Sequence, residues 1–259
     1  MKIIISPAKK MEECQEIFEP GGFPEYIAQT ELLYEHLKAM SESELQELFK
    51  ANAQITRQNF ERYRTMDIRR AQTPALLSYV GIQYQYMAPN LFTYEQWEYV
   101  RNHLRILSGF YGILNPDDRV TPYRLEMQAK LSVDGKKDLY DFWGRKLYEK
   151  LTKDGHGTIV NLASKEYSKA IEPYLTDEDH YITCVFGILQ NGKVKVKATE
   201  AKMARGEMVR FMAEGAIKSA EELKTFARLG YRYNTELSDT NNFIYLKEAI
   251  RENGEKTYV

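Results

Sequence analysis

Cysteine and histidine are scarce in this chain. The 259 residues include two cysteines, Cys14 and Cys184, and neither belongs to a CxxC motif. So few cysteines exclude a disulfide framework and fit a reducing compartment, the cytoplasm. The four histidines, at positions 36, 103, 156 and 180, show no HExxH spacing and no cysteine at zinc-ligand spacing. The sequence therefore predicts no stoichiometric metal, neither iron nor zinc.

Long apolar runs and an excess of one charge are also missing. The longest apolar stretch lies near 181–189, far short of the ~20 residues that a membrane span needs. Three isoleucines alone separate Lys2 from Ser6-Pro7, so no secretory segment is expected. The net charge of −1 gives no basic footprint typical of nucleic-acid binders. A local basic groove is still compatible with this composition, because the field depends on where the charges lie.

Known cofactor motifs are absent as well. The sequence contains no GxSxG and no Walker A motif, and the GFYG of residues 109–112 is not GxGxxG. We therefore expect no bound cofactor.

What is present indicates an ordered mixed α/β protein. Hydrophobic residues make up 43% of the chain and aromatic residues 12%, enough for a sizeable core. Asn191-Gly192 between two β-rich runs predicts a hairpin over 181–198 with a type I′ turn. Because strands and helices interleave, we expect one domain over 1–259 with a mixed sheet, of class α/β or α+β. Periodicity places further strands at 1–5, 74–80, 122–127 and 157–162, and helices at 25–40, 54–70, 138–151 and 200–215.

Polar residues lie where two buried strands end. Ser6 and Lys9 follow the first strand, and Asn161, Ser164 and Tyr167 lie at the end of the other. Ligands collect at the carboxyl ends of strands in α/β sheets, so these side chains are expected on one rim. Taken singly, Ser164 can instead be a helix N-cap and Lys9 a solvated lysine.

The segment 193–210 is rich in cations. Lys202, Gly206 and Arg210 are four residues apart and share one helical stripe. A glycine inside a helix costs about 1 kcal/mol relative to alanine, and either close approach of a phosphate or close helix packing would explain it. Arg205 falls near the apolar arc of the same helix, where a buried arginine needs a carboxylate or phosphate partner.

Two glycines, Gly109 and Gly112, interrupt the apolar run LRILSGFYGILNPDD at 104–118. Such glycines permit a tight turn or the close approach of a ligand. A DNA-binding hairpin would hold a phosphate on its amides, but its glycines are one residue closer together, and Asn115-Pro116 interrupts any second helix. The hairpin and a structural turn both stay open at this point.

Six segments together resemble the peroxide stress protein YaaA family. They are ISPAKK (5–10), HLRILSGFYGILNPDD (103–118), PYRLEM (122–127), DLYDFWG (138–144), NLASKEY (161–167) and AKMARGEMVRF (201–211). The resemblance implies a cytoplasmic bacterial protein of the hydrogen peroxide response that limits free iron and oxidative DNA damage. It also implies sequence-nonspecific binding of double-stranded DNA, through a positively charged cleft with a helix-hairpin-helix-like element.

The resemblance also implies which residues form the site. The family's recurrent polar residues fall on Ser6, Lys9, Arg124, Glu126, Trp143, Asn161, Ser164, Tyr167, Lys202, Arg205 and Arg210. The nucleic-acid contacts implied are Lys9, Arg124, Ser164, Lys202, Arg205, Gly206 and Arg210, with Gly109 and Gly112 as the hairpin candidate.

An enzyme is the alternative hypothesis. It would act on a small nucleotide-like or phosphorylated substrate, in a pocket lined by Lys9, Glu126, Asn161 and Tyr167. The resemblance favours DNA binding without catalysis. A long open basic groove would support DNA binding, whereas a deep closed pocket that holds both Glu126 and Lys9 would support the enzyme.

Overall fold

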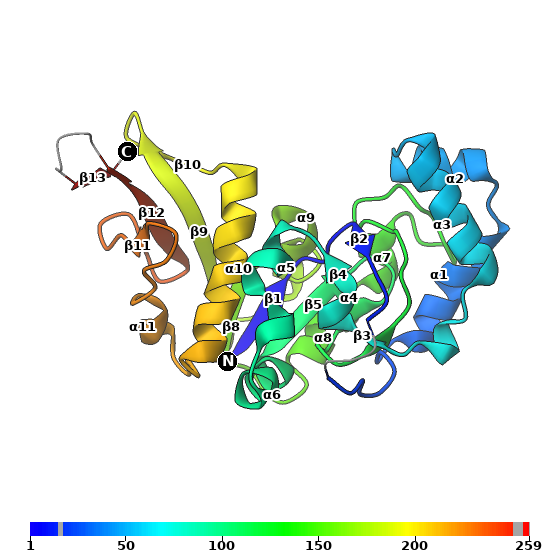
Figure 1. Ribbon diagram of the computed structural model, residues 1–259, viewed down its shortest axis with the longest axis horizontal. Helices are drawn as coiled ribbons and strands as arrows, with labels where there is room; N and C mark the ends of the chain where they lie inside the picture. The colour runs from blue at the N-terminus through cyan, green and yellow to red at the C-terminus, as the bar shows by residue number, and fades with distance from the viewer. Residues whose placement is uncertain (15–17, 251–255, 259) are drawn as a thin grey trace.

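A mixed β-sheet runs through the protein, whose computed structural model describes residues 1–14, 18–250 and 256–258 (Figure 1). Over these residues the main sheet has nine strands, in the order β11-β12-β9-β8-β1-β5-β6, with β10 beside β9 and β13 beside β12. The strands are β1 (Lys2–Ile5), β5 (Leu104–Ser108), β6 (Gly112–Leu114), β8 (Thr158–Leu162), β9 (His180–Gln190), β10 (Lys193–Lys195), β11 (Tyr231–Tyr233), β12 (Asn242–Ile250) and β13 (Lys256–Tyr258).

The central strands of this sheet are parallel and its margins antiparallel. β12, β9, β8, β1 and β5 form consecutive parallel pairs. β6, β10, β11 and β13 each pair antiparallel with a neighbour. The mixed α/β class expected from the sequence is therefore confirmed.

Helices surround the sheet and form a separate group at one end. The helices are α1 (Ile27–Ala39), α2 (Glu42–Phe49), α3 (Ala53–Thr65), α4 (Ala75–Ser78), α5 (Ile82–Met87), α6 (Tyr94–His103), α7 (Leu139–Trp143), α8 (Lys146–Leu151), α9 (Lys165–Ser168), α10 (Ala198–Glu214) and α11 (Ala220–Leu223). Short 3-10 turns are η1 (Ile68–Arg70), η2 (Pro89–Leu91) and η3 (Glu172–Tyr174). α10 packs on β9 and on α5, whereas α1, α2 and α3 pack together at the far right of Figure 1.

The middle of the sheet is fully buried. β1 lies between β5 and β8, and Ile3, Ile4 and Ile5 are all inaccessible to solvent. A strand covered on both faces has no polar side, which explains the continuous apolar run at the start of the sequence. Because β1 and β8 are parallel, the residues that follow them emerge at the same edge.

The predicted hairpin is confirmed. β9 and β10 pair antiparallel, with Lys193 opposite Gln190. Asn191 has φ 52° and Gly192 has φ 72°, as a type I′ turn requires. A Cβ at Gly192 would meet no atom within 4 Å, so its requirement for glycine is conformational and not steric.

Gly192→Val tests this turn. Valine at a left-handed position strains the backbone, so we expect a loss of stability of about 1–3 kcal/mol. The measurement is the denaturant midpoint, with Gly22→Val as control, because a Cβ at Gly22 also meets nothing within 4 Å and its φ lies outside the left-handed region. An unchanged midpoint for Gly192→Val would contradict the turn assignment.

Three local predictions were wrong. Residues 74–80 form no continuous strand, because the helical turn α4 separates two strands of two residues each. These are β3 (Thr73–Pro74), which pairs with β7 (Arg119–Val120), and β4 (Tyr79–Val80), which pairs with β2 (Lys10–Met11). Residues 122–127 alternate in burial as a strand would, but they pair with no strand in the described part of the chain. The helix expected over 138–151 is divided into α7 and α8 at Gly144, whose φ is +50°.

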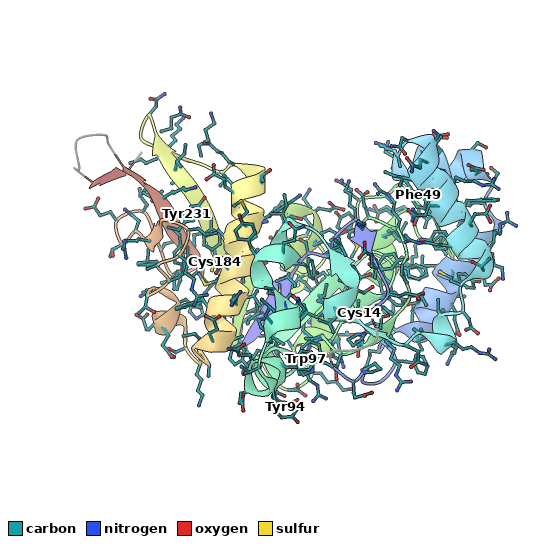
Figure 2. The ribbon with its side chains drawn as sticks, viewed as in Figure 1. Cys14, Phe49, Tyr94, Trp97, Cys184 and Tyr231 are labelled. Atoms are coloured by element: carbon teal, nitrogen blue, oxygen red, sulfur yellow. The ribbon has the colours of Figure 1, made fainter. Side chains whose placement is uncertain are left out.

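The two cysteines lie in different parts of the molecule. Cys184 is buried on β9, Cys14 is partly exposed, and both are free thiols. Figure 2 shows them well apart, with α10 and α5 between them in the view.

Over the described residues, no helix has the length and apolar character needed to cross a membrane.

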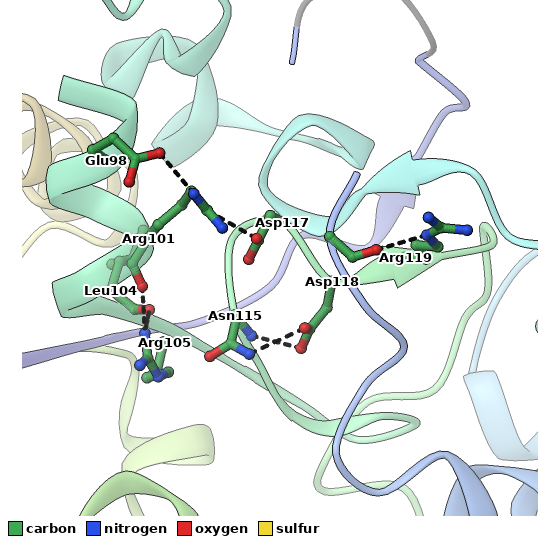
Figure 3. Close-up of polar contacts among 9 residues, drawn as sticks. Glu98, Arg101, Leu104, Arg105, Asn115, Asp117, Asp118 and Arg119 are labelled. Carbon is green, nitrogen blue, oxygen red and sulfur yellow. Dashed lines mark hydrogen bonds and ion pairs between the residues drawn. The ribbon is translucent and has the colours of Figure 1, made fainter. Parts of the chain in front are cut away.

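The two aspartates after β6 have different partners: Asp117 forms an ion pair, whereas Asp118 is buried and accepts hydrogen bonds from an asparagine (Figure 3). Asp117 pairs with Arg101 at 2.9 Å. Asp118 is 4% exposed, and it accepts hydrogen bonds from the backbone N–H and the side-chain amide of Asn115 at 2.8 and 3.1 Å. Burial raises the pKa of Asp118 to about 7, against the lowering effect of the Asn115 hydrogen bonds.

This raised pKa predicts a pH-dependent stability. Between pH 4 and pH 7 the folded state holds the Asp118 proton and the unfolded state releases it, so rising pH favours unfolding. The pKa rises from 3.8 to about 7, so wild type should lose roughly 4 kcal/mol over this range relative to Asp118→Asn. Urea unfolding of both proteins at several pH values measures this difference, and parallel pH profiles would contradict it.

Candidate functional site

A cavity of about 360 Å³ lies where the ends of β1 and β8 meet α5, α10 and the segment 122–127. Its lining residues are Ser6, Pro7, Ala8, Lys9, Lys10, Val80, Ile82, Gln83, Tyr84, Tyr123, Arg124, Leu125, Glu126, Ser164, Glu166, Tyr167, Lys202 and Arg205. Five of these side chains are cationic and two are carboxylates, so the lining has a net charge of +3. A chain of net charge −1 therefore contains a locally positive site.

Two serines join the strand ends that form one wall. Ser164 N–H donates to Ser6 Oγ at 2.8 Å, and Ser6 Oγ donates to Ser164 Oγ at 3.2 Å. Tyr84 of α5 donates its hydroxyl to the carbonyl of Ser6 at 2.9 Å. Ser164 is the N-cap residue of α9, but its side chain accepts no capping hydrogen bond. Its polar groups instead connect the two strand ends.

The segment 122–127 is held in place as a second wall. Tyr63 of α3 donates its hydroxyl to the carbonyl of Arg124 at 2.9 Å and accepts from the Arg124 N–H at 3.3 Å. Gly109 has no side chain where this segment crosses it, and a Cβ there would lie 2.6 Å from the carbonyl oxygen of Leu125. Close packing at Gly109 therefore brings Arg124 and Glu126 to the cavity.

Glu126 is shared by two cations. Its carboxylate lies 2.9 Å from Lys9 Nζ and 3.0 Å from the Arg124 guanidinium. The Arg124 and Glu126 side chains are 11% and 16% exposed, whereas Lys9 is 65% exposed. Arg124 and Glu126 thus form the inner part of the site, and Lys9 lies at its mouth.

Three buried donors in this lining have no partner. Gln83 Nε2, Arg124 Nε and Arg205 Nε are inaccessible and form no hydrogen bond within the described chain. Among the described residues, the Arg205 guanidinium also takes part in no ion pair. Burial lowers the pKa of Arg205, but an arginine in a protein stays charged. Unpartnered buried donors are rare, and several around one cavity point to a missing acceptor.

Burial disfavours the charged forms of several other lining groups. Burial raises the pKa values of the Tyr84 and Tyr167 hydroxyls far above their ordinary value, and that of Tyr123 as well. Burial also raises the pKa of Glu166, an effect opposed by the hydrogen bond from the Gln128 N–H and reinforced by the nearby Glu126. The cavity therefore combines cationic groups with an aromatic, uncharged wall.

A second cavity of about 780 Å³ adjoins the first and shares Lys9 and Glu126 with it. Its wall comes from α2 and residues 126–130, and its three lysines are balanced by three glutamates. The cleft thus continues toward the α1–α3 group, but the excess of positive charge is confined to the first cavity.

Most of the predicted polar residues meet at this site. Ser6, Lys9, Arg124, Glu126, Ser164, Tyr167, Lys202 and Arg205 all line the first cavity. Asn161 does not line it: it is 3% exposed near the end of β8, where its Oδ1 accepts from the Ala163 N–H. Trp143 is fully buried and donates Nε1–H to the carbonyl of Gly109 at 2.9 Å. Arg210 lies outside the lining and pairs with Glu214 at 2.7 Å. The roles of the residues that meet here stay predictions.

The three glycines have packing roles. Gly206 is buried, and a Cβ there would overlap the carbonyl oxygen of Gln83, so its backbone faces α5 and is not open to a phosphate. Gly109 and Gly112 belong to the buried turn between β5 and β6, not to a phosphate-binding hairpin. The amides of Phe110 and Tyr111 in this turn donate to Ser108 Oγ at 3.1 and 2.8 Å, so they have no capacity left for a phosphate.

The comparisons with known proteins show the family of this chain. Residues 1–237 match the family model described as peroxide stress protein YaaA. A UPF0246 protein of Desulfitobacterium hafniense is 53% identical over 247 residues, which cover 95% of this chain and 98% of the relative. The chain belongs to the peroxide stress protein YaaA family. A UPF0246 protein of Pediococcus pentosaceus is 49% identical over 252 residues, covering 97% of this chain and all of the relative.

Several lining residues of this YaaA-family chain were not singled out from the sequence. Tyr123 and Glu166 lie inside the motifs PYRLEM and NLASKEY, so their position beside Arg124 and Tyr167 was available as a signal. Lys10 follows Lys9 directly. Gln83 and Tyr84 belong to α5, and no sequence motif indicates that α10 places them at the site.

Gly206→Ala tests the helix contact that forms one side of the cavity. The added methyl group would collide with the Gln83 backbone, and overpacking of this kind costs about 1–3 kcal/mol, despite alanine's higher helix propensity. Chemical denaturation measures the change, with Gly22→Ala as control because a Cβ there meets nothing within 4 Å. A Gly206→Ala protein as stable as wild type would contradict the close packing of α10 on α5.

Proposed function

We propose that this member of a peroxide stress family binds double-stranded DNA without sequence preference at the cleft described above, and so limits oxidative DNA damage. The control of free iron that the family resemblance implies belongs to the same proposal. The observation that supports it is the convergence of Lys9, Lys10, Arg124, Lys202 and Arg205 on one cavity with buried donors that have no partner. Phosphate oxygens supply the acceptors that such donors need.

The arrangement of charge limits how the DNA backbone is bound. Lys9, Lys10 and Lys202 are exposed at the mouth of the cavity, where backbone phosphates can reach them. The adjoining cavity has no excess of positive charge, so the number of phosphate contacts is small. Three contacts correspond to a log–log salt slope of about −3.

Lys202→Ala tests the proposal. Removing one phosphate contact should weaken binding to all duplex sequences about equally and reduce the salt slope by about one. Lys218→Ala is the matched control: it removes the same charge from an exposed lysine beyond the far end of α10. Binding isotherms at several salt concentrations measure both variants. If Lys202→Ala and Lys218→Ala have the affinity and slope of wild type, the cleft is not the DNA site.

A second candidate function is catalysis on a small nucleotide-like or phosphorylated substrate. It is favoured by a specific observation: Glu126, a carboxylate shared by Lys9 and Arg124, lines the cavity. Tyr167 lines the same cavity, whereas Asn161 lies outside the lining. A ligand that binds only the folded state raises its melting temperature. Saturable stabilisation by a free nucleoside monophosphate, without any binding of duplex DNA, would favour this function over the first.

A further inference from the structure

The donors around the cavity lie at two depths. Lys9, Lys10 and Lys202 are exposed at the mouth. Gln83 is 7% exposed and the Arg124 side chain 11% exposed, and the unpartnered nitrogen of each is inaccessible, as is that of Arg205. A phosphate at the mouth can contact the lysines, but the inner donors need an acceptor that enters the cavity.

An intact duplex cannot supply that acceptor. The cavity measures about 360 Å³, near the lower end of the ~300–1,000 Å³ found for sites that enclose one small molecule. A duplex, whose major groove alone is about 12 Å wide, is too large to enter. A single nucleotide is small enough, provided that it leaves the base stack.

The chemistry of the inner wall matches a base more closely than a second phosphate. Tyr84, Tyr123 and Tyr167 line the cavity with Val80 and Leu125, which gives apolar and aromatic surface for a flat ring. The unpartnered groups are all N–H donors, and base edges carry ring-nitrogen and carbonyl acceptors. Aromatic side chains together with donors to a base edge are what enzymes use to hold a nucleotide outside the duplex.

We propose that one nucleotide of a bound DNA strand turns out of the duplex into this cavity. The backbone phosphates then lie against the lysines at the mouth, and the base accepts from Gln83 and, in addition, from Arg124 or Arg205. This inference rests on the DNA binding proposed above and adds to it a preference for sites where a base is easily unpaired. Extrusion costs least at a mismatch, so a mismatched duplex is the preferred ligand.

Three duplexes of equal length and charge test the proposal. One is fully paired, one has a central T·T mismatch, and one has an abasic residue in place of a mismatched thymidine. Wild type should bind the mismatched duplex about tenfold more tightly than the paired one. The abasic duplex is equally easy to deform but has no base that could enter the cavity. It should therefore bind about as weakly as the paired duplex.

Gln83→Met tests whether a donor inside the cavity is needed for the preference for the mismatched duplex. It removes one unpartnered donor without breaking any hydrogen bond in the described chain, so the fold should keep its melting temperature. We expect the tenfold preference for the mismatch to fall below threefold. Lys218→Ala, far from the cavity, should retain the full preference.

The outcomes separate this inference from the proposed function. Equal binding of all three duplexes overturns extrusion but leaves DNA binding intact, whereas binding of none overturns DNA binding itself. Equal gains for the abasic and mismatched duplexes also overturn the inference, because flexibility alone would explain them. Displacement of the mismatched duplex by free thymidine monophosphate at a concentration equal to that of the duplex would overturn it in favour of a small-molecule site. A mismatch preference that survives in Gln83→Met would exclude this cavity as the place where the base binds.

Discussion

The walls of the cavity lie close together because two glycines, Gly109 and Gly206, allow direct contact with a neighbouring backbone. At Gly109 the segment 122–127 crosses the turn after β5, and at Gly206 helix α10 meets the backbone of α5. A methyl group at either position would separate these elements. Each contact places an arginine at the cavity, Arg124 in the first case and Arg205 in the second. The tight packing of the fold and the composition of the site thus have the same origin.

The remaining wall follows from the parallel sheet. β1 and β8 end at the same edge, and the hydrogen bonds between Ser6 and Ser164 fix their ends to each other. The resulting enclosure removes water from donors that the chain itself does not satisfy. Such desolvation costs free energy unless an acceptor is bound. A bound anion or base would therefore gain more from these inner groups than from the exposed lysines at the mouth.

The sequence predicts much of this arrangement, but it does not predict the contacts between distant segments that complete the cavity. Asn191-Gly192 specifies its turn locally, and the polar residues after two buried strands indicate a shared rim. Residues 74–80 show the limit, because a short apolar run does not distinguish a strand from a helical turn. The segment 122–127 has strand-like alternation, but its backbone is held by Tyr63 and Gly109, residues distant in sequence. Gln83 could not be identified because its place depends on the packing at Gly206.

Arg124 and Arg205 hold their Nε–H groups ready for an acceptor on a bound ligand. The most direct measurement is NMR of the arginine Nε–H resonances, assigned with Arg→Lys variants, during titration with mismatched duplex DNA. We expect the Arg124 and Arg205 resonances to shift as these groups gain a hydrogen bond, whereas the resonance of Arg210, already paired with Glu214, should not change. Unchanged Arg124 and Arg205 resonances at saturating DNA would contradict it.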